Sequence, residues 1–367
     1  MDVISLTQKL LRFNTINPPG NEKELAEFCG EFLNKNGFNV KYFEFAENRL
    51  SVVAEAGITD NDAPLVLSGH LDTVPLGQKE WSVDPFSGEI KDGKLYGRGS
   101  CDMKGGVAAI MTAAVGALKS ALPKGGIRII LSASEENGCK GAAHLTQTVD
   151  LGKAKGVIIA EPTDNLPVCA HKGALYMWVK ASGVTAHSSM PKMGVNAIYK
   201  AARAITKIEN FKFDVEKDDV LGMPTINVGV VKGGLNINSV PDKAEFSIDV
   251  RSTTKIEHDD VLRQLQELLG NDLVLEPFVN CKPVYTAEND PFVNIVDLAA
   301  GVDRKSGAVP RALPYATDAA FLQDYYQAPT IILGPGEARM AHQTDEYCEV
   351  QSIENAVDIY SRIIKNL

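Results

Sequence analysis

The amino-acid sequence predicts an α/β protein whose larger domain has a mixed, mostly parallel sheet flanked by helices, with a smaller α+β domain inserted into it. Two observations lead to this fold class. Short β-branched runs alternate with helical stretches in the first half of the chain, as in a parallel sheet. The middle of the chain instead follows the order strand, helix, strand, strand, helix. We therefore expect the larger domain at residues 1–175 and 285–367, and the inserted domain at 176–284.

The elements of the larger domain are predicted from apolar runs and amphipathic stretches. The longest apolar runs, such as IRIIL at 127–131, are far too short to cross a bilayer. Strands are predicted at 65–68, 127–133, 156–160 and 330–333, and helices at 2–13, 22–36, 105–121 and 352–366.

The inserted domain has its own set of predicted elements. Turn residues such as Gly233, Gly234, Pro241 and Asp242 separate two of its strands. Strands are predicted at 174–182, 225–231 and 243–251, and helices at 196–209 and 258–269.

Composition narrows the class of partner and the compartment. The chain has 367 residues and a formal net charge of -10, which argues against nucleic acid and anionic membranes as partners. The N-terminal stretch MDVISLTQKLLRF lacks a basic segment followed by a continuous apolar one, so no signal peptide is expected. The six cysteines show no CxxC spacing and are expected to be reduced thiols in a cytoplasmic protein.

Ionisable residues follow each predicted strand of the larger domain. Ligands of open α/β sheets bind beyond the carboxyl ends of the strands, so these side chains should converge on one place. They are His70 and Asp72 after 65–68, Glu135 and Glu136 after 127–133, Glu161 after 156–160, His342 in the loop after 330–333, and Asp102 just before the helix at 105–121.

Taken one by one, these residues have ordinary explanations. A His-x-Asp at a strand end is more often a satisfied polar pair, and a Glu-Glu pair is more often a solvated turn. Together they are harder to dismiss, because burying so many carboxylates without cations would be very costly. Histidine combined with carboxylates suits zinc, cobalt or manganese.

Five motifs in these segments resemble one known family, that of acetylornithine deacetylases and succinyl-diaminopimelate desuccinylases, which also includes glutamate carboxypeptidases and aminoacylases. The resemblance covers essentially the whole chain. The motifs are HLDTVP at 70–75, GRG at 97–99 leading to DMKGG at 102–106, EE at 135–136, EPT at 161–163 and AH at 341–342.

The resemblance implies two divalent metal ions, with zinc first and cobalt or manganese as alternatives. It assigns His70 and Glu161 to the first ion, Glu136 and His342 to the second, and Asp102 to both. The three carboxylates then supply three negative charges against four positive ones, and the surplus favours an anionic intermediate.

The resemblance also assigns roles to residues that hold no metal. Glu135 would be the general base, and the peptide bond between Asp102 and Met103 would be cis. Asp72 lies two residues after His70, on the same face of an extended segment. It suits an acceptor that fixes the tautomer of His70, although it could merely cap a turn.

The inserted domain carries three more candidate residues. By resemblance, His187 in GVTAHSS would donate to the oxyanion, often from the partner subunit of a homodimer formed by this domain. Asn238 in GGLNINSVP matches the substrate-binding loop. Arg251 could grip a substrate carboxylate or form a surface salt bridge. A small sheet with an open edge also invites pairing with a second copy.

The predicted function is removal of the acyl group from a small N-acyl amino acid. The loops GPG at 334–336, AHQTDEY at 341–347 and YATD at 315–318 look closest to acetylornithine deacetylases. Succinyl-diaminopimelate desuccinylase is the first alternative, and a dipeptidase or carboxypeptidase is the next. A non-catalytic ligand-binding descendant is a further alternative. A serine hydrolase lacks support because the chain has no G-x-S-x-G motif.

Overall fold

The computed structural model describes residues 1–307 and 309–367, which form two compact units. The first unit comprises Met1–Ala170, Val284–Arg311 and Thr317–Leu367. The second comprises His171–Pro283 and Ala312–Ala316. Each unit has its own hydrophobic core, so each is described by itself.

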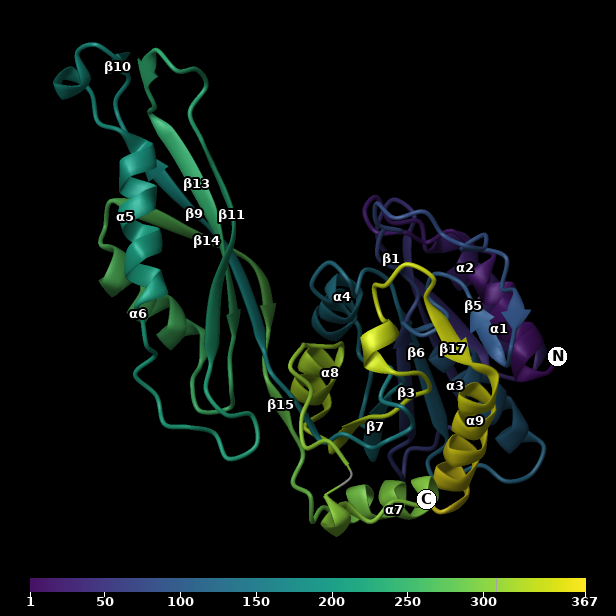
Figure 1. Ribbon diagram of the computed structural model, residues 1–367. Helices are drawn as coiled ribbons and strands as arrows, with labels where there is room; N and C mark the ends of the chain where they lie inside the picture. The colour runs from purple at the N-terminus through teal and green to yellow at the C-terminus, as the bar shows by residue number, and fades with distance from the viewer. Residues whose placement is uncertain (308) are drawn as a thin grey trace. The chain divides into compact units, whose positions relative to one another are not determined.

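A six-stranded mixed sheet forms the centre of the first unit (Figure 1). Four neighbouring strands of this sheet run parallel to one another. The first two strands of the chain form an antiparallel hairpin, which extends the sheet at one edge. This mostly parallel sheet confirms the predicted fold class. The strands lie in the order β1 (Asn39–Ala46), β2 (Arg49–Ala56), β6 (Ile127–Ser132), β3 (Leu65–His70), β7 (Gly156–Ile159) and β16 (Thr330–Ile332).

The inner strands β3, β6 and β7 are buried along their whole length, which explains their nearly continuous apolar sequences. Helices cover both faces of the sheet, with α4 and α8 on one side and α1, α3 and α9 on the other (Figure 1). The helices of this unit are α1 (Val3–Leu11), α2 (Lys23–Lys35), α3 (Lys104–Leu118), α4 (Lys140–Thr148), α7 (Pro291–Ala300), α8 (Ala319–Tyr326) and α9 (Val350–Lys365).

Helix α3 approaches the end of β7 closely at Gly106. A Cβ atom at this position would lie 2.2 Å from the carbonyl oxygen of Ala160. Only glycine therefore allows the first turn of α3, which follows Asp102, to lie against the strand end that precedes Glu161. A separate small antiparallel sheet contains, in this order, the strands β17 (Tyr347–Glu349), β5 (Lys94–Tyr96) and β4 (Ile90–Lys91).

The second unit is an antiparallel sheet whose core is closed by α5 (Ala197–Glu209) and α6 (His258–Leu269). Its strand β13 alternates buried and half-buried residues, as expected for a sheet with one covered face. The sheet order is β11 (Thr225–Gly233), β13 (Lys243–Arg251), β9 (Ala174–Ser182) and β14 (Leu273–Cys281). A short bridge in this unit pairs β10 (Ala186–His187) with β12 (Ser239–Val240). Where the chain passes from one unit to the other, β8 (Ala170–His171) pairs with β15 (Val284–Tyr285).

Besides several short strands of two or three residues, β1, β2 and β14 were absent from the prediction. Strands β1 and β2 form an edge hairpin, and β1 is half-buried or exposed throughout, so it has no apolar run. Strand β14 contains Pro277 next to an irregularity in its pairing with β9, and proline argues against a strand when only the sequence is read. Within the described residues, the helices are all too short or too polar to traverse a lipid bilayer.

Candidate functional site

The ionisable residues that follow the strands of the first unit meet at one edge of its sheet. Four strand ends contribute, and the loop before α3 adds a fifth segment. The side chains brought together are His70, Asp72, Asp102, Glu135, Glu136, Glu161 and His342.

Asp102 faces both histidines with different carboxylate oxygens. Its Oδ1 lies 3.0 Å from Nε2 of His70, and its Oδ2 lies 3.4 Å from Nε2 of His342. Each histidine also has a glutamate of its own. Oε1 of Glu161 is 3.8 Å from His70 Nε2, and Oε2 of Glu136 is 3.1 Å from His342 Nε2. The arrangement is thus two histidine–glutamate pairs that share one aspartate.

The buried carboxylate of Glu346 fixes the loop that carries Asp102. This carboxylate accepts hydrogen bonds from the backbone N–H groups of Gly99 (3.0 Å), Cys101 (2.8 Å) and Asp102 (3.0 Å). It is also paired with the guanidinium of Arg98 at 2.5 Å. The peptide bond between Asp102 and Met103 is cis, which confirms the prediction from the family resemblance.

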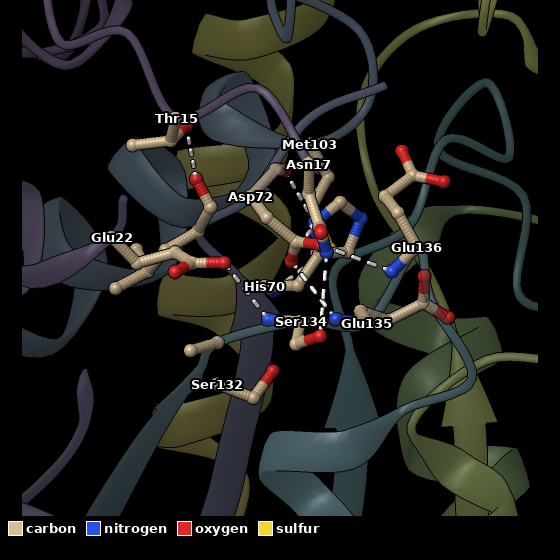
Figure 2. A network of polar contacts seen from close by, with 12 residues as sticks. Thr15, Asn17, Glu22, His70, Asp72, Met103, Ser132, Ser134, Glu135 and Glu136 are labelled. Carbon is tan, nitrogen blue, oxygen red and sulfur yellow. Dashed lines mark hydrogen bonds and ion pairs between the residues drawn. The ribbon is translucent and has the colours of Figure 1, made fainter. Parts of the chain in front are cut away.

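Asp72 lies at the centre of a polar network that includes His70, Glu135 and Glu136 (Figure 2). Its carboxylate accepts from the backbone N–H groups of Glu135 (2.9 Å) and Glu136 (3.2 Å), and from the amide of Asn17 (2.7 Å). Nδ1 of His70 is 2.9 Å from the Asp72 backbone carbonyl and 3.6 Å from its carboxylate. The carbonyl is therefore the nearer acceptor for His70, while the carboxylate holds the loop of both glutamates.

The site contains more buried negative charge than its histidines balance. Burial, together with the charge of Asp102, raises the pKa of Glu136 to about 7. Burial likewise raises the pKa values of Glu135 and Glu161 well above their usual range. Hydrogen bonds to Asp102 and Glu136 raise the pKa of His342 to about 10. Carboxylates this crowded and desolvated are stabilised by cations.

The donor atoms fit divalent metal ions. His70, Glu135 and Glu161 offer ligand atoms within 4.8 Å of one another, and so do His70, Asp102 and Glu136. Oε1 of Glu136 is buried and has no hydrogen-bond partner among the described residues. An orphaned carboxylate oxygen beside imidazole and carboxylate donors is what a zinc-type ion would satisfy.

Some residues of this region were not among the predicted site residues. Asp318, directly before α8, and Cys139, at the start of α4, form a further group with Glu135. A signal for Asp318 existed in the YATD segment, and one for Glu346 in AHQTDEY. No sequence pattern indicated Cys139, because its nearness to Asp318 depends on how separate loops fold.

The remaining predicted residues lie in the second unit. His187 and Asn238 are neighbours there, since β10 pairs with β12 and the Ser188 N–H donates to the Asn238 carbonyl at 3.0 Å. Arg251 lies elsewhere on the sheet, at the end of β13. Its guanidinium is paired with Asp249 at 2.8 Å and contacts the ring of Tyr176.

A family model described as peptidase family M20/M25/M40 matches residues 66–366. The chain belongs to this family. It is a hydrolase, which sets aside the non-catalytic alternative. A Staphylococcus aureus protein named probable succinyl-diaminopimelate desuccinylase is 31% identical, with 98% of each chain covered. An acetylornithine deacetylase of Vibrio cholerae is 30% identical. The alignment covers 94% of this chain and 92% of the Vibrio cholerae protein.

Solved structures share the fold of this M20 hydrolase. A tripeptidase from Staphylococcus aureus gives a TM-score of 0.77 at 23% identity, covering 99% of this chain and 97% of its own. An M20 family metallo-carboxypeptidase from Sulfolobus solfataricus gives a TM-score of 0.80 at 19% identity. The match covers 100% of this chain and 99% of the carboxypeptidase. At these identities the likeness concerns the fold alone.

Proposed function

We propose that this M20 hydrolase is a two-metal amidohydrolase that removes the acyl group from an N-acyl amino acid. The observation that carries the proposal is the position of Asp102 between His70 and His342, each paired with its own glutamate. Two half-sites that share one carboxylate suit a pair of divalent ions better than a single ion.

The residues that would hold the ions are His70 and Glu161 for the first, Glu136 and His342 for the second, and Asp102 for both. We propose zinc, with cobalt or manganese as alternatives, because the donors are imidazole and carboxylate. When bound, such ions polarise the scissile carbonyl and make water a better nucleophile.

Glu135 is proposed as the general base. Its backbone N–H is held by Asp72 at 2.9 Å, which fixes the loop while the side chain remains only half-buried. Its carboxylate would take a proton from the attacking water and pass it to the leaving nitrogen. Water and the amide are then converted into a carboxylate and a protonated amine, which carries both protons of the attacking water, with no net gain or loss of protons at Glu135.

The substrate is proposed to be an acylated diamino acid. The loops at 334–336 and 341–347 favour N-acetylornithine, while the named Staphylococcus aureus relative favours N-succinyl-diaminopimelate. Both names describe an acyl group on an amino acid that bears a second amine. We also propose a cytoplasmic location, since all six cysteines are described and none forms a disulfide.

Hydrolysis of a substrate panel tests the proposed function. Purified enzyme with added zinc or cobalt should cleave N-acetylornithine in preference to N-succinyl-diaminopimelate, N-acetyl-leucine and a dipeptide. Preference for the succinyl compound would shift the substrate to the first alternative, and preference for the dipeptide would make the protein a peptidase. Absence of any metal-dependent hydrolysis would reject the proposal.

The second unit is proposed to act as a lid and as the dimerisation domain. Leu235 and Ile237 are 98% and 99% exposed, near the exposed strand β11, and such a surface favours a second copy as partner. We propose that His187 of one subunit then donates to the oxyanion in the other, with Asn238 and Arg251 contacting substrate.

Subunit mixing tests this arrangement. Glu135→Ala and His187→Ala are each expected to be inactive alone. After subunit exchange, mixed dimers should regain one working site, formed by the intact metal centre of one chain and the intact His187 of the other. If heterodimers form and no activity returns, His187 does not act across the dimer.

A further inference from the structure

A second cluster of metal-ligating side chains lies beside the proposed base. Glu135, Cys139 and Asp318 each offer one ligand atom within 4.8 Å of the other two. Sγ of Cys139 is 3.4 Å from Oε1 of Glu135. Glu135 also belongs to the group with His70 and Glu161, so the cluster shares one residue with the main site.

The buried carboxylate of Asp318 has an oxygen available for a ligand. The side chain is 1% exposed, and its Oδ2 accepts a hydrogen bond from the hydroxyl of Ser132. Its Oδ1 has no N–H or O–H donor among the described residues, and the carboxylate's further partner is the weak S–H donor of Cys139. A buried carboxylate oxygen without a strong donor is unfavourable, and a cation stabilises it more effectively than a thiol does.

The thiol of Cys139 is fixed by the backbone of the loop after β6. Cys139 has a positive φ of 55°, and its N–H donates to the Glu135 carbonyl at 2.8 Å. The next N–H, that of Lys140, donates to the Ser134 carbonyl at 3.0 Å. These bonds tie the cysteine to the turn that carries Glu135, so the thiol and the carboxylate are pre-positioned rather than brought together by an ion.

We propose that Glu135, Cys139 and Asp318 form a third metal site, which binds a thiophilic divalent ion such as Zn²⁺ or Cd²⁺ and inhibits hydrolysis when filled. On binding, the Cys139 thiol releases its proton to solvent and the sulfur forms a bond to the ion, joined by one oxygen from each carboxylate. The inhibitory effect rests on the proposed role of Glu135, because a base bound to a cation no longer accepts a proton from water.

The ligand set determines which ions should use this site. The two proposed catalytic ions have only nitrogen and oxygen donors, which serve zinc, cobalt and manganese alike. The third site adds a thiolate, which favours zinc and cadmium over manganese. Manganese should therefore activate the enzyme over a wide concentration range, while zinc activates at low concentration and inhibits in excess.

Cadmium titration of the manganese-loaded enzyme tests the site directly. A bound thiolate gives cadmium an ultraviolet charge-transfer band, whereas nitrogen and oxygen donors do not. Wild type should show this band with one cadmium per chain, together with a loss of activity. Cys139→Ser should lack the band, and its inhibition midpoint, measured against its own uninhibited rate, should rise ~10–100-fold, the usual effect of altering a metal environment.

Two further variants distinguish specific loss of this metal site from a general loss of folded structure. Cys169→Ser removes another buried thiol of the first unit and should keep both the band and the inhibition. Asp318→Asn should retain the thiol but shift the cadmium midpoint upward, and thermal melting should show that each variant is folded.

The outcomes are separable from those of the substrate panel. No band in wild type at saturating cadmium, or a band that persists in Cys139→Ser, would overturn the metal site. A band that appears without loss of activity would overturn the inhibitory role. If no substrate were hydrolysed at all, the proposed function would fail, while the band and the cadmium stoichiometry would still decide the metal site.

Discussion

The two units of this protein each contain a feature that is unfavourable in isolation, but of opposite kinds. The first unit buries carboxylates such as Glu161, which is only 4% exposed and lies within the electrostatic influence of Asp102 and Glu136. The second unit exposes apolar side chains, with Ile237 at 99% and Val231 at 63%. Buried charge is stabilised by ions of opposite charge, and exposed apolar surface is stabilised by another protein surface.

This difference indicates what completes each unit. The charged site is assembled from strand ends far apart in the sequence, so it depends on the sheet and on metal ions. The apolar surface comes from β11 and the turn after it, which are continuous in the chain. The following changes alter one feature at a time.

Removing the shared aspartate should have the largest effect. Asp102→Ala takes away the carboxylate that faces both histidines, so both ions should be lost or weakly held. The stabilisation that metal ions give the transition state is several kcal/mol, so kcat/KM should fall on the order of 10³-fold or more. Metal analysis by mass spectrometry and steady-state kinetics would measure this. Exposed Asp164→Ala serves as the control, and full metal content in Asp102→Ala would contradict the shared-ligand assignment.

The neighbouring glutamates should respond differently to the same substitution. Glu135→Ala should keep two ions while kcat falls by at least ~10²-fold, since a general base is lost but no ligand of the catalytic pair. Glu136→Ala should instead weaken the occupancy of one site. Metal stoichiometry and kcat would be measured side by side. An active Glu135→Ala enzyme would end its assignment as the base.

Charge on the exposed apolar surface should weaken self-association. Ile237→Lys is expected to raise the dimer dissociation constant by at least ~10-fold, because an apolar side chain central to an interface contributes on the order of 1–2 kcal/mol. Analytical ultracentrifugation over a concentration series would detect this. Val274→Lys on β14, at the opposite edge of the sheet, is the matched control. Unchanged association of Ile237→Lys would remove this surface from the proposed interface.

Acid pH should destabilise the second unit, because it contains a buried histidine that is not a proposed metal ligand. His171 is fully buried, and burial lowers its pKa to about 4. Between pH ~6.5 and ~4 the unfolded chain is protonated at His171 while the folded chain is not, so the free energy of unfolding falls as the pH falls. The pKa of His171 differs by about 2.5 units between the unfolded and the folded chain. The free energy of unfolding therefore falls by about 3 kcal/mol at most.

Denaturant unfolding of His171→Asn at several pH values checks this expectation. Asparagine does not titrate here, and its amide can replace Nδ1 as donor to the Lys172 carbonyl, which lies 2.9 Å away. The variant should lose less stability than wild type between pH 6.5 and 4. Equal slopes would show that His171 does not remain neutral in the folded protein.

The sequence predicted much of the first unit because its strands are fully buried. Strands β3, β6 and β7 are nearly continuous apolar runs, and such runs can be recognised without knowledge of their neighbours. The exposed or half-buried β1 and the proline-containing β14 carry no such signal. Their strand conformation depends on pairing with partners that the sequence does not specify locally.

The sequence by itself determined which chemistry this protein could carry, because histidine and carboxylates after each parallel strand must meet at one edge of the sheet. Only the tertiary structure decided that Asp102 faces two histidines, that the Asp72 carbonyl is the nearest acceptor for His70, and that Cys139 and Asp318 lie beside Glu135. These relations depend on side-chain directions and loop paths, which are fixed by packing between segments far apart in the chain.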